Sequence, residues 1–240
     1  MYKFLLRPKW IATHFLVIVL MVTMVNLANW QWHRYHERKD FNATLVQRFD
    51  VPVSPLSTLL TNGKPADIEW MPTEMSGTYL QGKDVSLVNV SQSGIAGYDA
   101  VTPLLMSDGK VVLVNRGFVP LATPFPAAPS GEISILGRVR ATSKRRTGEV
   151  SDPITGDLTE VHRIDIDRLQ KQIDGQLLPV YVQLLKSTPV ESNSLSPIAD
   201  PEFSNGPHLS YTVQWLLFTL CAAGGWLALV KRELAKQRTA

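Results

Sequence analysis

Two long uncharged apolar runs, residues 10–30 and 209–230, divide this chain of 240 residues. Each run has at least 21 residues. Because an α-helix rises about 1.5 Å per residue, either run is long enough to cross the roughly 30 Å hydrocarbon core of a bilayer. The pattern therefore predicts two transmembrane helices that flank a large, more polar segment.

The polar sequence after the first run continues the helical pattern. Residues 33–48 are rich in helix-forming side chains, and Pro52 and Pro55 follow them. Proline ends a helix because it lacks the backbone N–H donor and clashes with the preceding turn. We therefore expect the first helix to extend well beyond the membrane boundary.

Short apolar stretches between the two runs predict β-strands. They cover residues 85–90, 101–106, 111–114, 133–141 and 178–185. The pair Asp108–Gly109 separates two of these stretches. An Asp-Gly pair in that position favours a hairpin with a type I′ turn, in which both central residues have positive φ.

The other segments of the large domain are predicted to be a loop, a short helix and an irregular arm. Residues 123–131 contain three prolines, residues 164–173 have a helical pattern, and residues 187–206 are rich in Ser, Pro and Asn. The expected fold class is a membrane α+β protein with a mainly antiparallel β domain and one or two helices between the spans. The pattern leaves open whether that domain is a small barrel or a sandwich.

The charge distribution predicts the orientation of the chain. Residues 1–9 and residues 231–240 each carry a net charge of +3, whereas residues 31–210 hold 17 Lys and Arg against 20 Asp and Glu, a net of −3. Cytoplasmic flanks of membrane helices are enriched in Lys and Arg, so both tails are expected in the cytoplasm and the domain 31–208 outside it. The acidic balance of that domain argues against a nucleic-acid partner.

A cleaved signal peptide is the alternative interpretation of residues 1–30. The apolar run is longer than the usual core of a signal peptide, and no small-x-small cleavage site precedes Trp30. We therefore expect a retained anchor, and the short basic N-terminus favours a bacterial plasma membrane over an organelle. Cys221, the single cysteine, falls in the second run, so the large domain is expected to fold without disulfides.

Aromatic and imidazole side chains gather where the two runs meet the large domain. Trp30 and Gln31 end the first run, and His208, Tyr211 and Trp215 open the second with i, i+3 and i+7 spacing, which places them on one helix face. One interpretation is an aromatic belt at the lipid–water boundary. The other is a haem site, in which a neutral imidazole binds the iron and the indole rings line the porphyrin.

The large domain offers a structural motif but no convincing catalytic set. A strand ending in Asn115-Arg116-Gly117 predicts a turn in which glycine has positive φ and the arginine binds loop carbonyls or a carboxylate. The set of His162, Asp165 and Asp167 matches no metal-site or triad spacing. The chain is therefore not expected to be an enzyme.

Three segments together resemble the Surfeit locus protein 1 family. They are Trp30-Gln31-x-x-Arg34, Thr102-Pro103 leading into Val112-Leu113-Val114-Asn115-Arg116-Gly117-Phe118-Val119-Pro120, and His208-Leu209-x-Tyr211-x-x-Gln214-Trp215. The resemblance covers nearly the whole chain, including both apolar runs.

The resemblance implies an assembly factor for haem–copper cytochrome c oxidase that acts when haem a is inserted into the catalytic subunit. It implies His208 as the candidate ligand of the haem iron, and docking or structural roles for Asn115, Arg116, Gly117 and Arg34. The expected partners are oxidase subunit I, other respiratory-complex subunits and membrane lipid. An alternative is a permanent accessory subunit that stabilises a respiratory oxidase or supercomplex through its membrane helices.

Overall fold

A computed structural model describes residues 3–143, 145 and 147–239 of the chain. Met1, Tyr2 and Ala240, which belong to the predicted tails, lie outside the described residues. The chain divides into two compact units, one formed by Met1–Thr44 with Glu202–Ala240 and the other by Leu45–Pro201.

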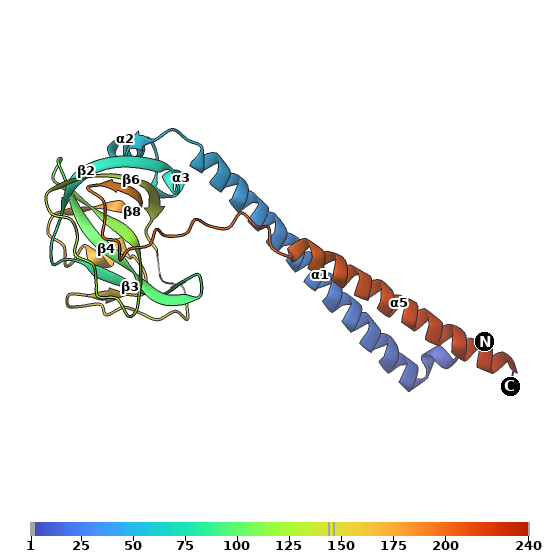
Figure 1. The fold of residues 1–240 in the computed structure, drawn as a ribbon. Helices are drawn as coiled ribbons and strands as arrows, with labels where there is room; N and C mark the ends of the chain where they lie inside the picture. Colours follow the sequence, from blue (N-terminus) through green and yellow to red (C-terminus); the bar gives the residue numbers. More distant parts are fainter. Residues whose placement is uncertain (1–2, 144, 146, 240) are drawn as a thin grey trace. The chain divides into compact units, whose positions relative to one another are not determined.

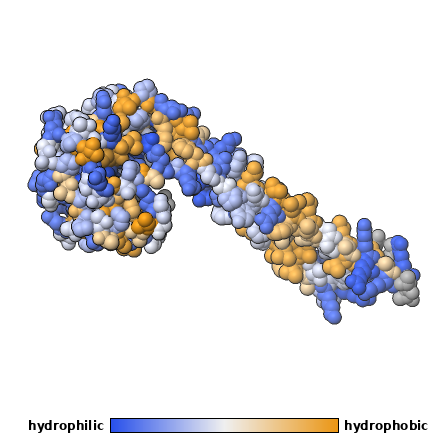
Figure 2. All heavy atoms as spheres, in the orientation of Figure 1, coloured by the Kyte–Doolittle hydropathy of each residue, from blue (hydrophilic) through white to orange (hydrophobic). Residues whose placement is uncertain are grey.

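The first unit is built from two long helices, α1 (Pro8–Phe49) and α5 (His208–Thr239), preceded by a short 3₁₀ turn, η1 (Lys3–Leu6). Both are long and apolar enough, by length and composition, to cross a membrane. The two helices run side by side, and Figure 2 shows apolar side chains gathered along them with hydrophilic residues where the chain termini lie. The continuous course of α1 confirms the predicted extension of the first helix.

The second unit is a mixed β-sheet with three short helices (Figure 1). Its elements in chain order are β1 (Ser54–Pro55), α2 (Leu56–Asn62), α3 (Pro65–Ile68), β2 (Pro72–Tyr79), β3 (Val85–Gln92), β4 (Ile95–Met106), β5 (Lys110–Pro120), β6 (Glu132–Ala141), β7 (Glu160–Val161), α4 (Ile166–Leu169) and β8 (Gln176–Thr188). The strand order is β1-β2-β6-β8-β5-β4-β3-β7. Because β2 also pairs with β4, the pairings β2–β6–β8–β5–β4–β2 return to their starting strand.

Strand β5 shows how both faces of the sheet are buried. Val112 and Val114 belong to an apolar cluster with Tyr79 and Leu104, whereas Val111 and Leu113 pack on a second cluster formed with residues 158–173. Successive side chains of a strand point to opposite faces. Continuous burial therefore explains why residues 111–114 are all apolar instead of alternating with polar residues.

The structure confirms the predicted strands and their mainly antiparallel pairing, and it adds parallel pairings that the prediction did not contain. The ladder between β5 and β8 is parallel, as are the two-residue pairings β1–β2 and β3–β7. The described residues also include three short helices in this unit instead of one or two. A parallel pairing joins strands that are far apart in sequence, which local alternation does not reveal.

The predicted hairpin exists, but its turn is not type I′. Gly109 has a φ of 78°, whereas Asp108 is not among the residues with positive φ. The Gly109 N–H donates to the Met106 carbonyl at 3.0 Å, and the Lys110 N–H donates to the Asp108 carboxylate at 3.1 Å. The aspartate thus stabilises the turn through its side chain, and of these two residues only the glycine adopts the left-handed conformation.

Candidate functional site

His208, the first residue of α5, makes a polar contact with Gln31 of α1. The His208 Nδ1 lies 2.8 Å from the Gln31 Oε1. Both residues belong to the helical unit, and both were singled out from the sequence. The structure therefore brings an imidazole and an amide from opposite ends of the chain into direct contact.

This contact fixes the proton on the histidine ring. An amide oxygen only accepts hydrogen bonds, so the His208 Nδ1–H must donate to Gln31. In the neutral ring the Nε2 atom then carries the free lone pair, which is the form that binds a metal. A hydrogen-bonded Nδ1 with a free Nε2 is the arrangement found in most metal-ligating histidines.

Gly206 lies close to the edge of the His208 ring. Its φ is +65°, a conformation that favours glycine. A Cβ atom added at Gly206 would lie 3.3 Å from the His208 Cδ2 and 3.4 Å from the Nε2. The Gly206 backbone therefore lies beside the ring edge that carries Nε2, a position that was not predicted from the sequence.

The aromatic residues proposed with His208 are Trp30 of α1 and Tyr211 and Trp215 of α5. Trp30 and Tyr211 have exposed fractions of 54% and 45%. Trp215 packs its ring edge-on against Phe218, with 5.8 Å between the ring centroids. The structure thus brings together His208 and Gln31, while the aromatic rings offer an open apolar surface rather than an enclosed pocket.

Further polar contacts lie on the same two-helix unit. The Asn42 amide donates to the Asn205 side-chain oxygen at 3.0 Å, and the Asn42 Oδ1 is buried without a partner among the described residues. Arg34 lies on the surface of α1 and pairs with Glu37 at 2.8 Å. A surface pair of this kind contributes little to stability, so Arg34 remains accessible to a partner surface.

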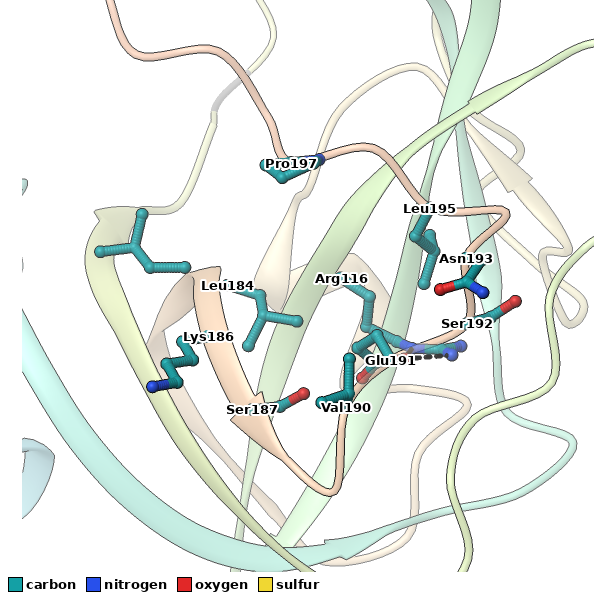
Figure 3. A pocket seen from close by; sticks show the side chains of 11 residues that line it. Arg116, Leu184, Lys186, Ser187, Val190, Glu191, Ser192, Asn193, Leu195 and Pro197 are labelled. Atoms are coloured by element: carbon teal, nitrogen blue, oxygen red, sulfur yellow. Dashed lines mark hydrogen bonds and ion pairs between the residues drawn. The ribbon is translucent and has the colours of Figure 1, made fainter.

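In the β unit, Arg116 lies at the centre of a buried polar cluster (Figure 3). Its side chain is fully buried, and its Nη2 lies 2.7 Å from the Oε2 of Glu191, whose side chain is 8% exposed. The guanidinium also donates to the carbonyls of Pro126 and Ala127 at 3.0 and 2.9 Å and to the Thr102 hydroxyl at 3.3 Å. Arg116 therefore connects β5 to strand β4, to the loop that follows β5 and to the arm that carries Glu191, which is distant in sequence.

Glu191, which the sequence analysis missed, completes this cluster from the irregular arm after β8. Its Oε1 accepts a hydrogen bond from the Tyr79 hydroxyl at 3.0 Å. Burial, followed by the charge of Glu191, raises the pKa of Tyr79 well above its usual range. The tyrosine therefore stays protonated as a donor to the carboxylate.

Asn115 and Gly117, the neighbours of Arg116, also make close contacts within the β unit. Gly117 has a φ of +146°, and a Cβ there would lie 2.7 Å from the Ser196 carbonyl oxygen. The buried Asn115 amide donates to the Asp99 carboxylate at 2.9 Å. The predicted strand end at these residues is wrong, because β5 continues to Pro120. The glycine marks a close approach of the arm to a strand whose register shifts at this point.

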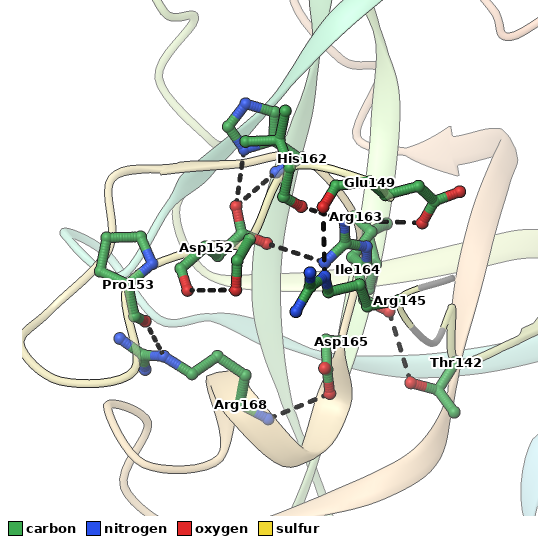
Figure 4. A network of polar contacts seen from close by, with 12 residues as sticks. Thr142, Arg145, Glu149, Asp152, Pro153, His162, Arg163, Ile164, Asp165 and Arg168 are labelled. Atoms are coloured by element: carbon green, nitrogen blue, oxygen red, sulfur yellow. Dashed lines mark hydrogen bonds and ion pairs between the residues drawn. The ribbon is translucent and has the colours of Figure 1, made fainter. Parts of the chain in front are cut away.

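A second polar network holds the long segment between β6 and α4 (Figure 4). The Asp152 carboxylate accepts from the backbone N–H of His162 at 2.9 Å and lies 2.7 Å from the His162 Nδ1. Asp165 caps α4 by accepting from the Arg168 N–H at 3.2 Å. These groups serve the fold of the segment, and within the described residues no three His, Cys, Asp or Glu side chains gather as a metal site.

Comparison with known proteins identifies the family of the chain. The model of the SURF1 family matches residues 18–220. This span includes most of α1, the first part of α5 and the whole β unit. The chain belongs to the SURF1 family. The resemblance inferred from the three sequence segments is thereby confirmed.

Named relatives extend the SURF1 match along most of the chain. An uncharacterized SURF1-like protein of Mycobacterium tuberculosis is 28% identical over 231 residues, covering 92% of this chain and 83% of the relative. A SURF1-like protein of Monosiga brevicollis is 27% identical and covers 88% and 85% of the two chains. Surfeit locus protein 1 of Xenopus tropicalis is 23% identical, covering 88% and 73%.

Proposed function

We propose that this SURF1-family chain is a membrane-anchored assembly factor for haem–copper cytochrome c oxidase, which assists haem a insertion into the catalytic subunit. Family membership supports the general role, and the pair of apolar helices supports action within the membrane. The chain acts as a carrier or chaperone rather than an enzyme, with haem a as its cargo. Its partners are oxidase subunit I and other respiratory-complex subunits.

The observation that carries the haem part of this proposal is the contact between His208 and Gln31. The Gln31 oxygen holds the Nδ1 proton, which leaves the Nε2 of His208 available as an axial ligand to iron. Trp30 and Tyr211 supply exposed aromatic surface near the same helix ends, suited to the apolar faces of a porphyrin.

In this proposal the chain lies in a bacterial plasma membrane with both termini in the cytoplasm and the β unit outside. The net charge of +3 on each tail supports this orientation. His208 and Gln31 then lie at the outer boundary of the membrane.

A haem-binding measurement tests the role of His208. Full-length protein purified from cells that make haem a is expected to show a haem absorption spectrum, which His208→Ala removes. His36→Ala is the matched control, because the His36 Nδ1 contacts only the Trp32 carbonyl of its own helix, at 3.0 Å. Equal haem content in the wild type and in His208→Ala contradicts the ligand role.

A Gln31 series separates ligation from positioning. Gln31→Glu keeps an acceptor for the His208 Nδ1–H and makes the imidazole a stronger ligand, whereas Gln31→Ala removes the acceptor. Loss of a partner of this kind typically lowers metal affinity by about 10- to 100-fold. Gln31→Glu is therefore expected to retain at least as much haem as the wild type, and Gln31→Ala to retain much less. Identical retention in both variants contradicts the positioning role of Gln31.

The alternative, a permanent accessory subunit, differs in when the chain is bound. The small residues Gly224 and Gly225 of α5 have open space where a Cβ would lie, so a helix of another protein has room to approach. After gentle detergent extraction, an assembly factor is expected mainly with immature subunit I. Stoichiometric recovery with the mature oxidase supports the permanent subunit instead.

A further inference from the structure

A groove opens between α1 and α5 at the ends that carry the chain termini. It has a volume of about 380 Å³, and its lining includes Lys9, Trp10, Leu229, Arg232, Glu233 and Lys236. Both helices belong to the same compact unit. The groove therefore combines an apolar wall from each helix with three cations and one carboxylate.

A contact between the helices fixes the inner end of this groove. The Trp226 indole N–H donates to the His14 Nδ1 at 2.9 Å. Trp10 lies beside His14, with 5.8 Å between the ring centroids, and the buried Phe4 packs edge-on against Trp10 at 5.0 Å. This aromatic cluster joins the two helices beside the groove and positions the Trp10 ring that lines it.

The cations lie where the apolar sequence ends. Lys9 directly precedes the uncharged run 10–30, and Arg232 and Lys236 follow the uncharged run 209–230 on successive turns of α5. Within the described part of the chain, neither Lys9 nor Arg232 forms an ion pair. Positive charge is thus concentrated at the boundary between hydrocarbon and water.

A ligand for this groove must be anionic at one end and apolar at the other. The guanidinium of Arg232 suits the planar arrangement of phosphate oxygens, and the lysines act as further point charges. Trp10 and Leu229 offer apolar surface on the membrane side of these cations, which suits an acyl chain. Basic pockets between membrane helices on the cytoplasmic side bind anionic lipid head groups in this way.

We infer that the groove is a binding site for one anionic glycerophospholipid, with its phosphate between Lys9, Arg232 and Lys236 and an acyl chain along Trp10 and Leu229. The site anchors the ends of α1 and α5 to each other through the lipid. This inference rests on the insertion of both helices into a membrane, which is part of the proposed function. It does not depend on haem or on the oxidase.

Native mass spectrometry of the full-length protein in detergent tests the inference. Dioleoyl phosphatidylglycerol and dioleoyl phosphatidylcholine are titrated separately, and inorganic phosphate is added as a competitor. The groove variant is Lys9→Gln/Arg232→Gln/Lys236→Gln. The matched control is Arg7→Gln/Lys231→Gln/Arg238→Gln, which removes the same charge from the same helix ends but leaves the groove lining unchanged.

The wild type is expected to bind its first phosphatidylglycerol at least about ten-fold more tightly than phosphatidylcholine, since each nearby cation favours anionic lipid. The groove variant is expected to lose this preference, and the control to keep it. Equal binding of the two lipids by the wild type overturns the inference. If both variants lose the preference for phosphatidylglycerol equally, the lipid is attracted by general surface charge. If inorganic phosphate displaces the lipid, the groove is a site for small anions. Either result also overturns the inference.

The assay contains neither haem nor oxidase, so its failure leaves the proposed assembly function untouched. Helix content measured by circular dichroism must match between the two variants. If the groove variant alone is unfolded, the single substitution Arg232→Gln is compared with Lys231→Gln, and an equal lipid preference in these two variants overturns the inference.

Discussion

Removal of Arg116 is expected to destabilise the β unit strongly. In Arg116→Ala the buried Glu191 carboxylate loses both guanidinium hydrogen bonds, at 3.0 and 2.7 Å, and keeps only the Tyr79 hydroxyl. The carbonyls of Pro126 and Ala127 lose their donors at the same time. The perturbation therefore leaves one buried carboxylate without its counter-ion and the buried Pro126 carbonyl without its guanidinium donor.

The size of the effect follows from the burial of the pair. Breaking a buried ion pair by removing one partner costs about 3–5 kcal/mol. For a domain of 150–250 residues each kcal/mol shifts the melting temperature by about 2–4 °C, so a loss of roughly 6–20 °C is expected. Arg145→Ala is the matched control, because Arg145 is exposed and, among the described residues, its Nε donates to the Glu149 carbonyl at 3.1 Å. Its expected cost is within about 0.5 kcal/mol.

Differential scanning calorimetry of the full-length protein in detergent measures these shifts. The double variant Arg116→Ala/Glu191→Ala provides the decisive comparison, because removing the second partner also removes the stranded charge. The double variant is expected to be more stable than the sum of the single losses predicts, by about 0.5–3 kcal/mol. Additive losses, or an Arg116→Ala shift no larger than that of Arg145→Ala, refute the anchoring role of Arg116.

Three further predictions concern the β unit. Burial raises the pKa of Asp99 in the folded state, so the protein loses stability as the pH rises above about 4 and Asp99 ionises. In urea titrations, the stability of Asp99→Asn relative to the wild type should therefore increase from pH 4 to pH 7. A constant difference contradicts this prediction. Burial raises the pKa of Tyr79 in the folded state, so the stability of the protein should fall as the pH rises past about 10. The variant Tyr79→Phe should show a smaller decline of stability with pH. An equal decline in the wild type and the variant contradicts this prediction. Gly117→Ala should lower the free energy of unfolding by about 1–3 kcal/mol more than Gly82→Ala does. Both glycines have a positive φ, but only at Gly117 does a Cβ meet the Ser196 carbonyl. Equal losses of stability in urea unfolding contradict this prediction.

Local pattern predicted those parts of the fold that depend on near neighbours in sequence. The helix formers of residues 33–48 continue α1, and the apolar stretches on each side of Asp108–Gly109 form β4 and β5. Strand β2 was missed. Its alternate positions are buried, but they include Thr73 and Gly77. Gly77 is buried, and the backbone of Leu105 occupies the place where a Cβ of residue 77 would lie. The strand therefore alternates between buried and exposed positions without an alternation of apolar and polar residues in the sequence.

The same limit applies to the two polar clusters. The sequence singled out Arg116, but Glu191 lies in an arm without periodic pattern, and only the tertiary fold brings the two together. His208 and Gln31 were each singled out at a helix end. Their hydrogen bond depends on how the two helices are rotated about their axes, which residue spacing within either helix does not determine. Side-chain chemistry was therefore predictable, while the pairing of distant residues was not.

The central proposal is that His208 serves haem delivery to the oxidase, and complementation of a strain lacking this chain tests it most directly. The measured quantity is the haem a absorbance of the oxidase in isolated membranes, with equal amounts of each variant verified by immunoblot. Wild type and His36→Ala are expected to restore the absorbance, and His208→Ala to leave it reduced. Full absorbance with His208→Ala, or in the strain without the chain, would contradict the proposal.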